Sequence, residues 1–192
     1  MLSLSLQDRL FNAFPTLETP RLVLRAMSPA DAQELFRVCS DARVAEHQDW
    51  APFTRLSEAT QLINERLDLY RRRVRVSWGL CLAPNGPLIG QIGMHSLSLR
   101  DRRAELAFDL RSDYWRQGLM TEALRAVSSF AFERCQLNKL VAQTVVENAA
   151  CHELLVKLGF EIEGRLPAHY HWKGAFRDVH LYGLVGRCKA GT

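Results

Sequence analysis

The sequence lacks the cysteine patterns that build disulfide frameworks or zinc sites. It has five cysteines, an odd number, and no two of them form a Cys-x-x-Cys pair. They are Cys39, Cys81, Cys135, Cys151 and Cys188. A disulfide-stapled secreted domain or a zinc ribbon needs a regular set at close spacing. We therefore expect reduced thiols, a cytoplasmic location and no metal site.

Long apolar runs, internal repeats and low-complexity tracts are missing as well. No apolar stretch reaches the roughly 20 residues that a membrane-spanning helix needs, so no membrane partner is expected. The formal net charge is only +4 over 192 residues. That small excess suits an anionic small ligand and gives little support for a nucleic-acid partner. Length and an apolar share of 47% fit one globular domain over residues 1–192.

What the sequence does contain is a clear order of helical and extended patterns. Leu2, Leu6, Leu10 and Phe14 repeat every four residues and predict a helical extension within residues 1–16. Later helices are predicted from Ser28, from Ser57 to about Arg72, and over 119–135 and 149–158. Strands are predicted over 21–25, 76–83, 88–97, 104–110, 140–146, 160–164 and 179–185. A strand meander followed by strand–helix alternation predicts an α/β (α+β) fold. Its central sheet is mixed and mostly antiparallel, with helices on both faces.

The segment from Leu110 to Ala123 joins a strand to a helix and contains Gly118. Backbone N–H groups at a helix start lack intrahelical partners and lie at the positive end of the helix dipole. A glycine there lets a phosphate approach the backbone, so the turn could hold a pyrophosphate beside the charge of Arg116. The alternative is an ordinary loop glycine before a helix, because a single-glycine motif is weak.

The segment from Asn148 to Phe160 contains a second helix start. Asn148 can cap the helix and Gly159 can end it, which explains both residues structurally. The functional alternative is that Asn148 binds a ligand at the same helix start.

Together these segments resemble the two signature motifs of the GNAT acetyltransferases, in the family's order and spacing. Trp115-Arg116-Gln117-Gly118-Leu119-Met120-Thr121-Glu122-Ala123 resembles the pyrophosphate loop of the branch that includes the ribosomal-protein N-terminal acetyltransferases. Asn148-x-x-Cys151 with Leu158-Gly159-Phe160 resembles that branch's Asn-x-x-Ser helix. Thr19 to Arg25 and Gly174-x-x-x-Asp178-x-x-x-Tyr182 resemble its opening and closing strands. The resemblance covers about residues 17–185.

The resemblance implies that the sheet splays apart between the strands around Phe108 and Val141. The pantetheine arm of acetyl-CoA, the implied cosubstrate, would lie in that gap. Backbone N–H groups of the loop would face the pyrophosphate, and Leu110 would meet the thioester end. The implied acetyl-CoA contacts are Leu110, Arg116, Gln117, Gly118, Met120, Thr121 and Asn148.

Several positions depart from the family pattern. Trp115 and Met120 replace the usual loop residues, which backbone binding tolerates. Cys151 replaces the helix serine of the branch, and Leu155 stands where other members carry an acid tyrosine. Tyr170 stands where some branch members carry a glutamate base.

Amine acetylation needs a group that takes a proton, because only a neutral amine attacks a thioester. At pH 7 an α-amino group, with a pKa of about 8, is partly neutral, whereas a lysine, with a pKa of about 10.4, is not. Glu105 lies on the strand before Leu110, where several members of the superfamily carry a base glutamate, so the resemblance makes it the candidate base. Cys151 is the candidate donor to the departing thiolate, and Tyr170 is a third catalytic candidate. The alternatives are a solvated strand residue for Glu105 and a small buried hydrophobic residue for Cys151.

The remaining features have simple interpretations. Arg71-Arg72-Arg73-x-Arg75 is expected to end a helix as a solvated basic face. His169-x-His171 would lie on one strand face without a third metal ligand. Trp50 and Phe53 lie in a loop that usually borders the acceptor in this branch, so they are candidate substrate-binding residues; they could equally belong to the core.

These observations predict an N-acetyltransferase that moves acetyl from acetyl-CoA to a primary amine in a direct ternary complex. The acceptor, a protein N-terminus or a small amine, stays open, and a homodimer is possible. One rival is an acyl-CoA-binding regulator without catalysis, and a second is an RNA- or ribosome-binding protein.

Overall fold

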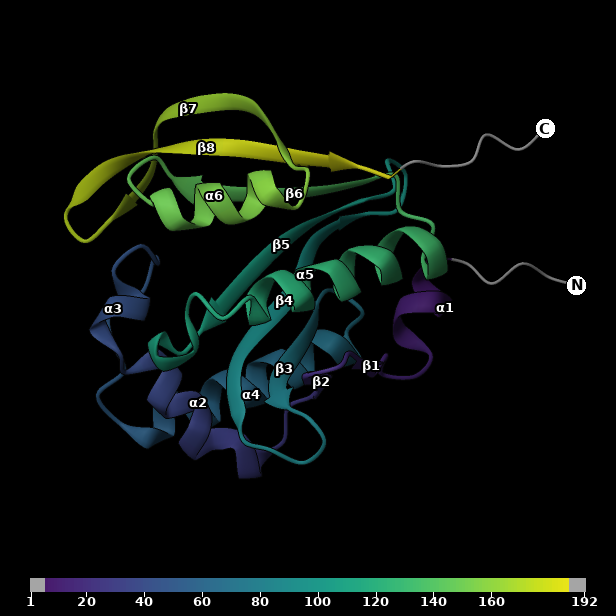
Figure 1. Ribbon diagram of the computed structural model, residues 1–192, viewed down its shortest axis with the longest axis vertical. Helices are drawn as coiled ribbons and strands as arrows, with labels where there is room; N and C mark the ends of the chain where they lie inside the picture. The colour runs from purple at the N-terminus through teal and green to yellow at the C-terminus, as the bar shows by residue number, and fades with distance from the viewer. Residues whose placement is uncertain (1–5, 187–192) are drawn as a thin grey trace, which may run out of the picture.

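One eight-stranded sheet organises the chain in the computed structural model, which describes residues 6–186 (Figure 1). The strand order is β1-β2-β3-β4-β5-β6-β8-β7. The strands are β1 Leu17–Glu18, β2 Leu22–Ala26, β3 Val76–Leu82, β4 Leu88–Ser98, β5 Arg103–Leu110, β6 Lys139–Val145, β7 Glu161–Trp172 and β8 Ala175–Val185. Among these strands only β5 and β6 pair in parallel. The predicted mixed, mostly antiparallel sheet is therefore confirmed.

Helices cover both faces of this sheet. They are α1 Leu6–Phe11, α2 Ala32–Cys39, α3 Ala42–Ala45, α4 Leu56–Arg71, α5 Leu119–Ser129 and α6 Ala149–Lys157. Residues of α1, α5 and α6 join the larger apolar cluster on one face, and residues of α2, α3 and α4 join a second cluster on the other. None of the helices in the described range is long and apolar enough to cross a bilayer.

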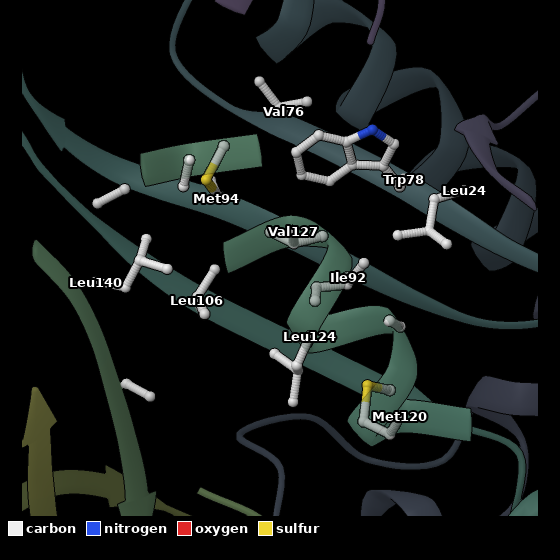
Figure 2. Close-up of a cluster of buried hydrophobic side chains, with 14 of the residues drawn as sticks. Leu24, Val76, Trp78, Ile92, Met94, Leu106, Met120, Leu124, Val127 and Leu140 are labelled. Carbon is white, nitrogen blue, oxygen red and sulfur yellow. The ribbon is translucent and has the colours of Figure 1, made fainter. Parts of the chain in front are cut away.

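The larger cluster explains why apolar and polar side chains alternate along the strands. Trp78, Ile92 and Met94 point from β3 and β4 toward Leu124 and Val127 of α5 (Figure 2). All five side chains are fully buried, and each contributes roughly 1.5–3 kcal/mol through burial of its apolar surface. This packing fixes α5, and with it the turn that precedes α5, against the sheet.

The sheet opens between β5 and β6. The two strands pair from Arg103↔Lys139 to Leu106↔Ala142, and the pairing stops there. Both strands nevertheless continue, β5 to Leu110 and β6 to Val145. The expected splay is confirmed, and it begins just beyond Leu106 and Ala142.

Several element boundaries differ from the sequence predictions. The last two strands form a hairpin that is much longer than predicted, because the register of β7 shifts between Leu166 and Tyr170 and the simple alternation is lost. The short β1 and α3 were not predicted. The helix expected to reach Cys135 is α5 followed by a π-helical turn over Phe130–Arg134. In the helical extension, Leu10 and Phe11 are buried in the core, and Leu2 lies outside the described residues. Cys188, near the other end of the chain, also lies outside them.

Candidate active site

The turn before α5 presents free backbone N–H groups at the open end of the split. Gly118 caps the helix in the left-handed region, with φ of 76°. The first intrahelical hydrogen bond runs from Glu122 N to Gly118 O at 3.0 Å, so the N–H groups of residues 119–121 have no helical acceptor. A Cβ built on Gly118 would meet only Arg21 Nη2, at 3.5 Å. The turn is therefore open to an anion.

Side chains from the start of the sheet hold this turn in place through hydrogen bonds. Arg21 Nε donates to Glu122 Oε2 at 2.7 Å, and its Nη1 donates to the carbonyl of Gln117 at 2.8 Å. Thr19 Oγ1 donates to the other oxygen of Glu122 at 2.6 Å. An open groove of about 540 Å³ adjoins the turn, and its lining includes Arg21, Arg125 and Lys157. The surroundings of the turn are thus rigid and basic.

The other loop residues take distinct positions. Met120 and Thr121 bury their side chains, which leaves their backbone for a ligand. Arg116 is exposed and left-handed, with φ of 59°. Leu110 lies at the open end of the split, where its carbonyl accepts a hydrogen bond from the Trp115 indole at 2.7 Å. The contacts of these residues with acetyl-CoA stay predictions.

The start of α6 brings Asn148 and Cys151 together. Asn148 Oδ1 accepts a hydrogen bond from Cys151 N at 3.1 Å, which confirms the capping role. Its binding of a ligand stays a prediction. Burial raises the pKa of the Cys151 thiol to about 11, against a hydrogen bond with Thr144 that lowers it. The thiol is therefore protonated at neutral pH and able to donate.

Glu105 and Tyr170 lie close enough to interact electrostatically near the closed end of the split. Glu105 is opposite Val141, near the end of the parallel ladder. Burial raises the pKa of Glu105, which makes its carboxylate a stronger base. The Tyr170 hydroxyl donates to Gln143 Oε1 at 3.0 Å, two residues beyond Val141. Burial and the charge of Glu105 raise the pKa of Tyr170, so it stays protonated.

The sequence analysis missed a second carboxylate on the sheet face that carries Glu105, which we call the polar face. Asp109 lies four residues after Glu105 and, by strand alternation, on the same face of β5. Gln48 Nε2 donates to Asp109 Oδ1 at 2.6 Å, and Gln91 Nε2 donates to Oδ2 at 3.0 Å. Burial raises the pKa of Asp109 to about 6. The alternation of charged residues along β5 was the signal that could have revealed it.

The loop predicted to border the acceptor contacts the polar face through Gln48 rather than through Trp50 or Phe53. Gln48 contacts Asp109, whereas Trp50 and Phe53 stack on each other with ring centroids 5.7 Å apart. Both aromatic rings are partly buried and pack against the second apolar cluster. This packing fits the core alternative, and their contact with an acceptor stays a prediction.

The arginine run is not one solvated face. Arg72 and Arg73 are exposed and lie near Asp68 and Asp8. Arg75 is instead half-buried on the polar face, where its Nε donates to Ser77 Oγ at 2.9 Å. The prediction for Arg75 was wrong, because the helix has ended at Arg71 and the side chain packs over Gly93 of the sheet. His169 and His171 lie on β7, and the described residues contain no group of three potential metal ligands.

Most of these features lie within the segment that matches one known protein family. The model of the acetyltransferase (GNAT) domain matches residues 21–161, which hold the turn before α5, the split and the start of α6. The chain belongs to the GNAT acetyltransferases. It is therefore an acetyl-CoA-dependent acyltransferase.

Known GNAT proteins resemble the whole chain. The uncharacterized N-acetyltransferase YoaA of Bacillus subtilis is 31% identical over 172 residues, 90% of this chain and 97% of that protein. Spermidine N(1)-acetyltransferase of Escherichia coli is 25% identical over 157 residues, 81% of each chain. RimL, a ribosomal L7/L12 alpha-N-protein acetyltransferase solved with coenzyme A, has a TM-score of 0.80 and 18% identity, covering 89% of this chain and 98% of that one. The names of the last two give different acceptors, spermidine and a ribosomal protein.

Proposed function

We propose that this GNAT enzyme transfers acetyl from acetyl-CoA to a primary amine by direct attack in a ternary complex. The observation that carries the proposal is the split beyond Leu106↔Ala142, with Glu105 at its closed end and the Gly118 turn at its open end. This arrangement gives the pyrophosphate and the amine separate sites that both reach the gap. Acetyl-CoA supplies the activated acyl group.

Residues on and beside the polar face carry out the proton transfers. Glu105 takes the proton of the amine, because burial makes its carboxylate a stronger base. Above its pKa of about 6, Asp109 is negatively charged and attracts the protonated amine to the polar face. Tyr170, held by Gln143, stands on the far side of the gap as a hydrogen-bond donor. These roles place the acceptor on the face of the sheet that α2 and α4 cover.

Direct transfer fits the state of Cys151 better than a covalent route. A thiolate is the nucleophilic form of cysteine, and burial raises the pKa of Cys151 to about 11. At neutral pH the protonated thiol instead donates a hydrogen bond to the departing coenzyme A thiolate, which takes its proton from the amine or from solvent because the coenzyme A thiol is the stronger acid.

Initial-rate kinetics test the proposal. With acetyl-CoA and an amine both varied, a ternary complex gives intersecting double-reciprocal lines, and intact-mass analysis finds no acetylated Cys151. Parallel lines with an acetyl-Cys151 peptide contradict direct transfer. Acetyl-CoA binding without turnover of any amine indicates the rival regulatory module instead.

The acceptor class is open between a protein N-terminus and a small amine. A cytoplasmic location, a homodimer, a single domain over residues 1–192 and the absence of a nucleic-acid partner also stay predictions.

A further inference from the structure

Two arginines, Arg75 and Arg66, lie close enough to Glu105 and Asp109 on the polar face to interact with their charges. Arg75 precedes β3, and a Cβ built on Gly93 would lie 2.9 Å from its Nη2. The guanidinium therefore rests on Gly93, where no side chain separates it from the sheet. Gly93 pairs with Ala107, which lies between the two carboxylates on β5. The guanidinium is thus about one strand spacing, roughly 4.8 Å, from the strand that carries the acids.

No carboxylate neutralises the Arg75 guanidinium at short range. Within residues 6–186, Arg75 makes no ion pair, and its one side-chain hydrogen bond goes to Ser77. Burial, with the nearby charge of Arg66, lowers the pKa of Arg75 to about 10 against the attraction of Glu65, Asp109 and Glu105, so it is still a cation at neutral pH. These carboxylates act only at longer range than an ion pair, and the half-buried guanidinium keeps donors free. A ligand that brings an anion would give this cation a direct partner.

Arg66 of α4 adds a second cation with unused donors. Its side chain is 18% exposed, and its Nη1 pairs with Glu65 at 2.9 Å. Its buried Nε has no hydrogen-bond partner in the described structure. Burial and these two arginines lower the pKa of His95 to about 4, so His95 is neutral and adds no charge. The polar face therefore has cations at Arg75 and Arg66 and carboxylates on β5.

We infer that the acceptor carries a carboxylate close to its primary amine, as a free amino acid does. Arg75, supported by Arg66, binds the carboxylate, since a guanidinium pairs with a carboxylate through two parallel hydrogen bonds. The amine then lies over Ala107, between Glu105 and Asp109 and beside the split. A polyamine would bring a second positive charge toward Arg75, and a simple alkylamine would leave Arg75 without a partner. This inference rests on the proposed function and specifies its acceptor.

Matched amine pairs test the substrate class. Thiol release from acetyl-CoA is measured with glycine against glycinamide, glutamate against glutamine, β-alanine against propylamine, and spermidine. The wild-type enzyme is expected to favour glycine and β-alanine at least tenfold in kcat/KM over their uncharged counterparts, and to favour either acid over spermidine. Glutamate and glutamine both keep the α-carboxylate, so they separate recognition of that group from recognition of a side-chain acid.

Arginine variants test the assigned contact. Arg75→Gln should raise KM for the preferred acid at least tenfold and leave the affinity for acetyl-CoA unchanged, whereas Arg75→Lys should keep part of the preference. Arg71→Gln, at the exposed end of α4, is the matched control and should behave like the wild type. If Arg75→Gln does not fold, Arg66→Gln should show the same loss in weaker form.

The outcomes separate this inference from the proposed function. Equal or better turnover of glycinamide, propylamine or spermidine overturns the carboxylate site but leaves the acetyltransferase intact. The same holds if both arginine variants keep the wild-type acid preference. An enzyme that binds acetyl-CoA and acetylates no amine contradicts the proposed function, and the inference falls with it.

Discussion

The two faces of strands β3, β4 and β5 differ sharply although they are made of alternating residues of the same segments. Under α5 the inward side chains are apolar and buried, and they hold helix and sheet together (Figure 2). On the opposite face the strands carry Gln91, Glu105 and Asp109, with Arg75 directly before β3 and neighbours from α4 and the loop after α3. Stability is concentrated on the first face, and the chemistry is concentrated on the second. Side chains that are neighbours in sequence should therefore give different kinds of mutational effect.

Glu105→Gln should give the largest effect and confine it to catalysis. A positioned general base contributes typically about 10²–10⁴-fold, so kcat should fall by that factor, most for amines of high pKa. The affinity for acetyl-CoA should change little, because the amide keeps the shape of the carboxylate, and the unfolding midpoint should not fall, because burial already disfavours the charged form of Glu105. Steady-state kinetics combined with thermal melts check this. A wild-type kcat in Glu105→Gln would remove Glu105 as the base.

Ile92→Ala tests the apolar face of the neighbouring strand. Ile92 is fully buried beneath α5, and truncation of such a side chain costs about 2–5 kcal/mol of unfolding free energy. Urea denaturation should show this loss, while kcat of the folded enzyme stays within a few-fold of the wild type. A large fall in kcat without loss of stability would break the division between the faces.

Asp109→Asn sharpens the comparison through its pH dependence. Burial raises the pKa of Asp109 from 3.8 to about 6, so the native state binds more protons than the unfolded state between these values. Its contribution to stability is full below pH 4 and is lost as the pH rises through about 6. The variant should therefore gain up to about 3 kcal/mol over the wild type at pH 8. Loss of a hydrogen bond from Gln48 or Gln91 reduces this gain.

Denaturation at pH 4 and pH 8 provides the check. The difference between Asp109→Asn and the wild type should grow with pH, and kcat/KM for a charged amine should fall in the variant. A difference that is constant with pH would show that Asp109 titrates normally.

Changes at Cys151 should have the smallest effect. A coenzyme A thiol has a pKa similar to that of cysteine, about 8.5, and so leaves readily without help. Cys151→Ala is expected to lower kcat by about tenfold or less, and Cys151→Ser should keep most of the activity because a hydroxyl can also donate. If the serine variant is inactive and the wild type accumulates an acetylated Cys151, transfer is covalent.

The sequence predicted the apolar face better than the polar one. Strand periodicity, the cap at Asn148 and the stop at Gly159, whose φ is 87°, are local signals and were correctly interpreted. Burial of Asp109 depends on Gln48, 61 residues away, which no local pattern reveals. The inward turn of Arg75 depends on the missing side chain of Gly93 in the next strand. The predicted strands of the β7–β8 hairpin were too short, because its exposed, register-shifted residues give no regular alternation of apolar and polar side chains.

The central claim is that acetyl-CoA binds with its pyrophosphate at the Gly118 turn, so that its acyl group reaches the polar face. Titration calorimetry of acetyl-CoA into the wild type and Gly118→Asp tests this most directly. The left-handed backbone accepts aspartate more readily than most residues, and the Cβ has room, so the variant should fold.

Gly118→Asn is the matched control, with the same shape and no charge. The wild type should bind acetyl-CoA and gain roughly 2.7 kcal/mol of stability at a hundredfold excess over Kd. Gly118→Asp should show no binding, and Gly118→Asn should be weakened less, because only the carboxylate repels the pyrophosphate. A folded Gly118→Asp protein with wild-type affinity for acetyl-CoA would contradict the account.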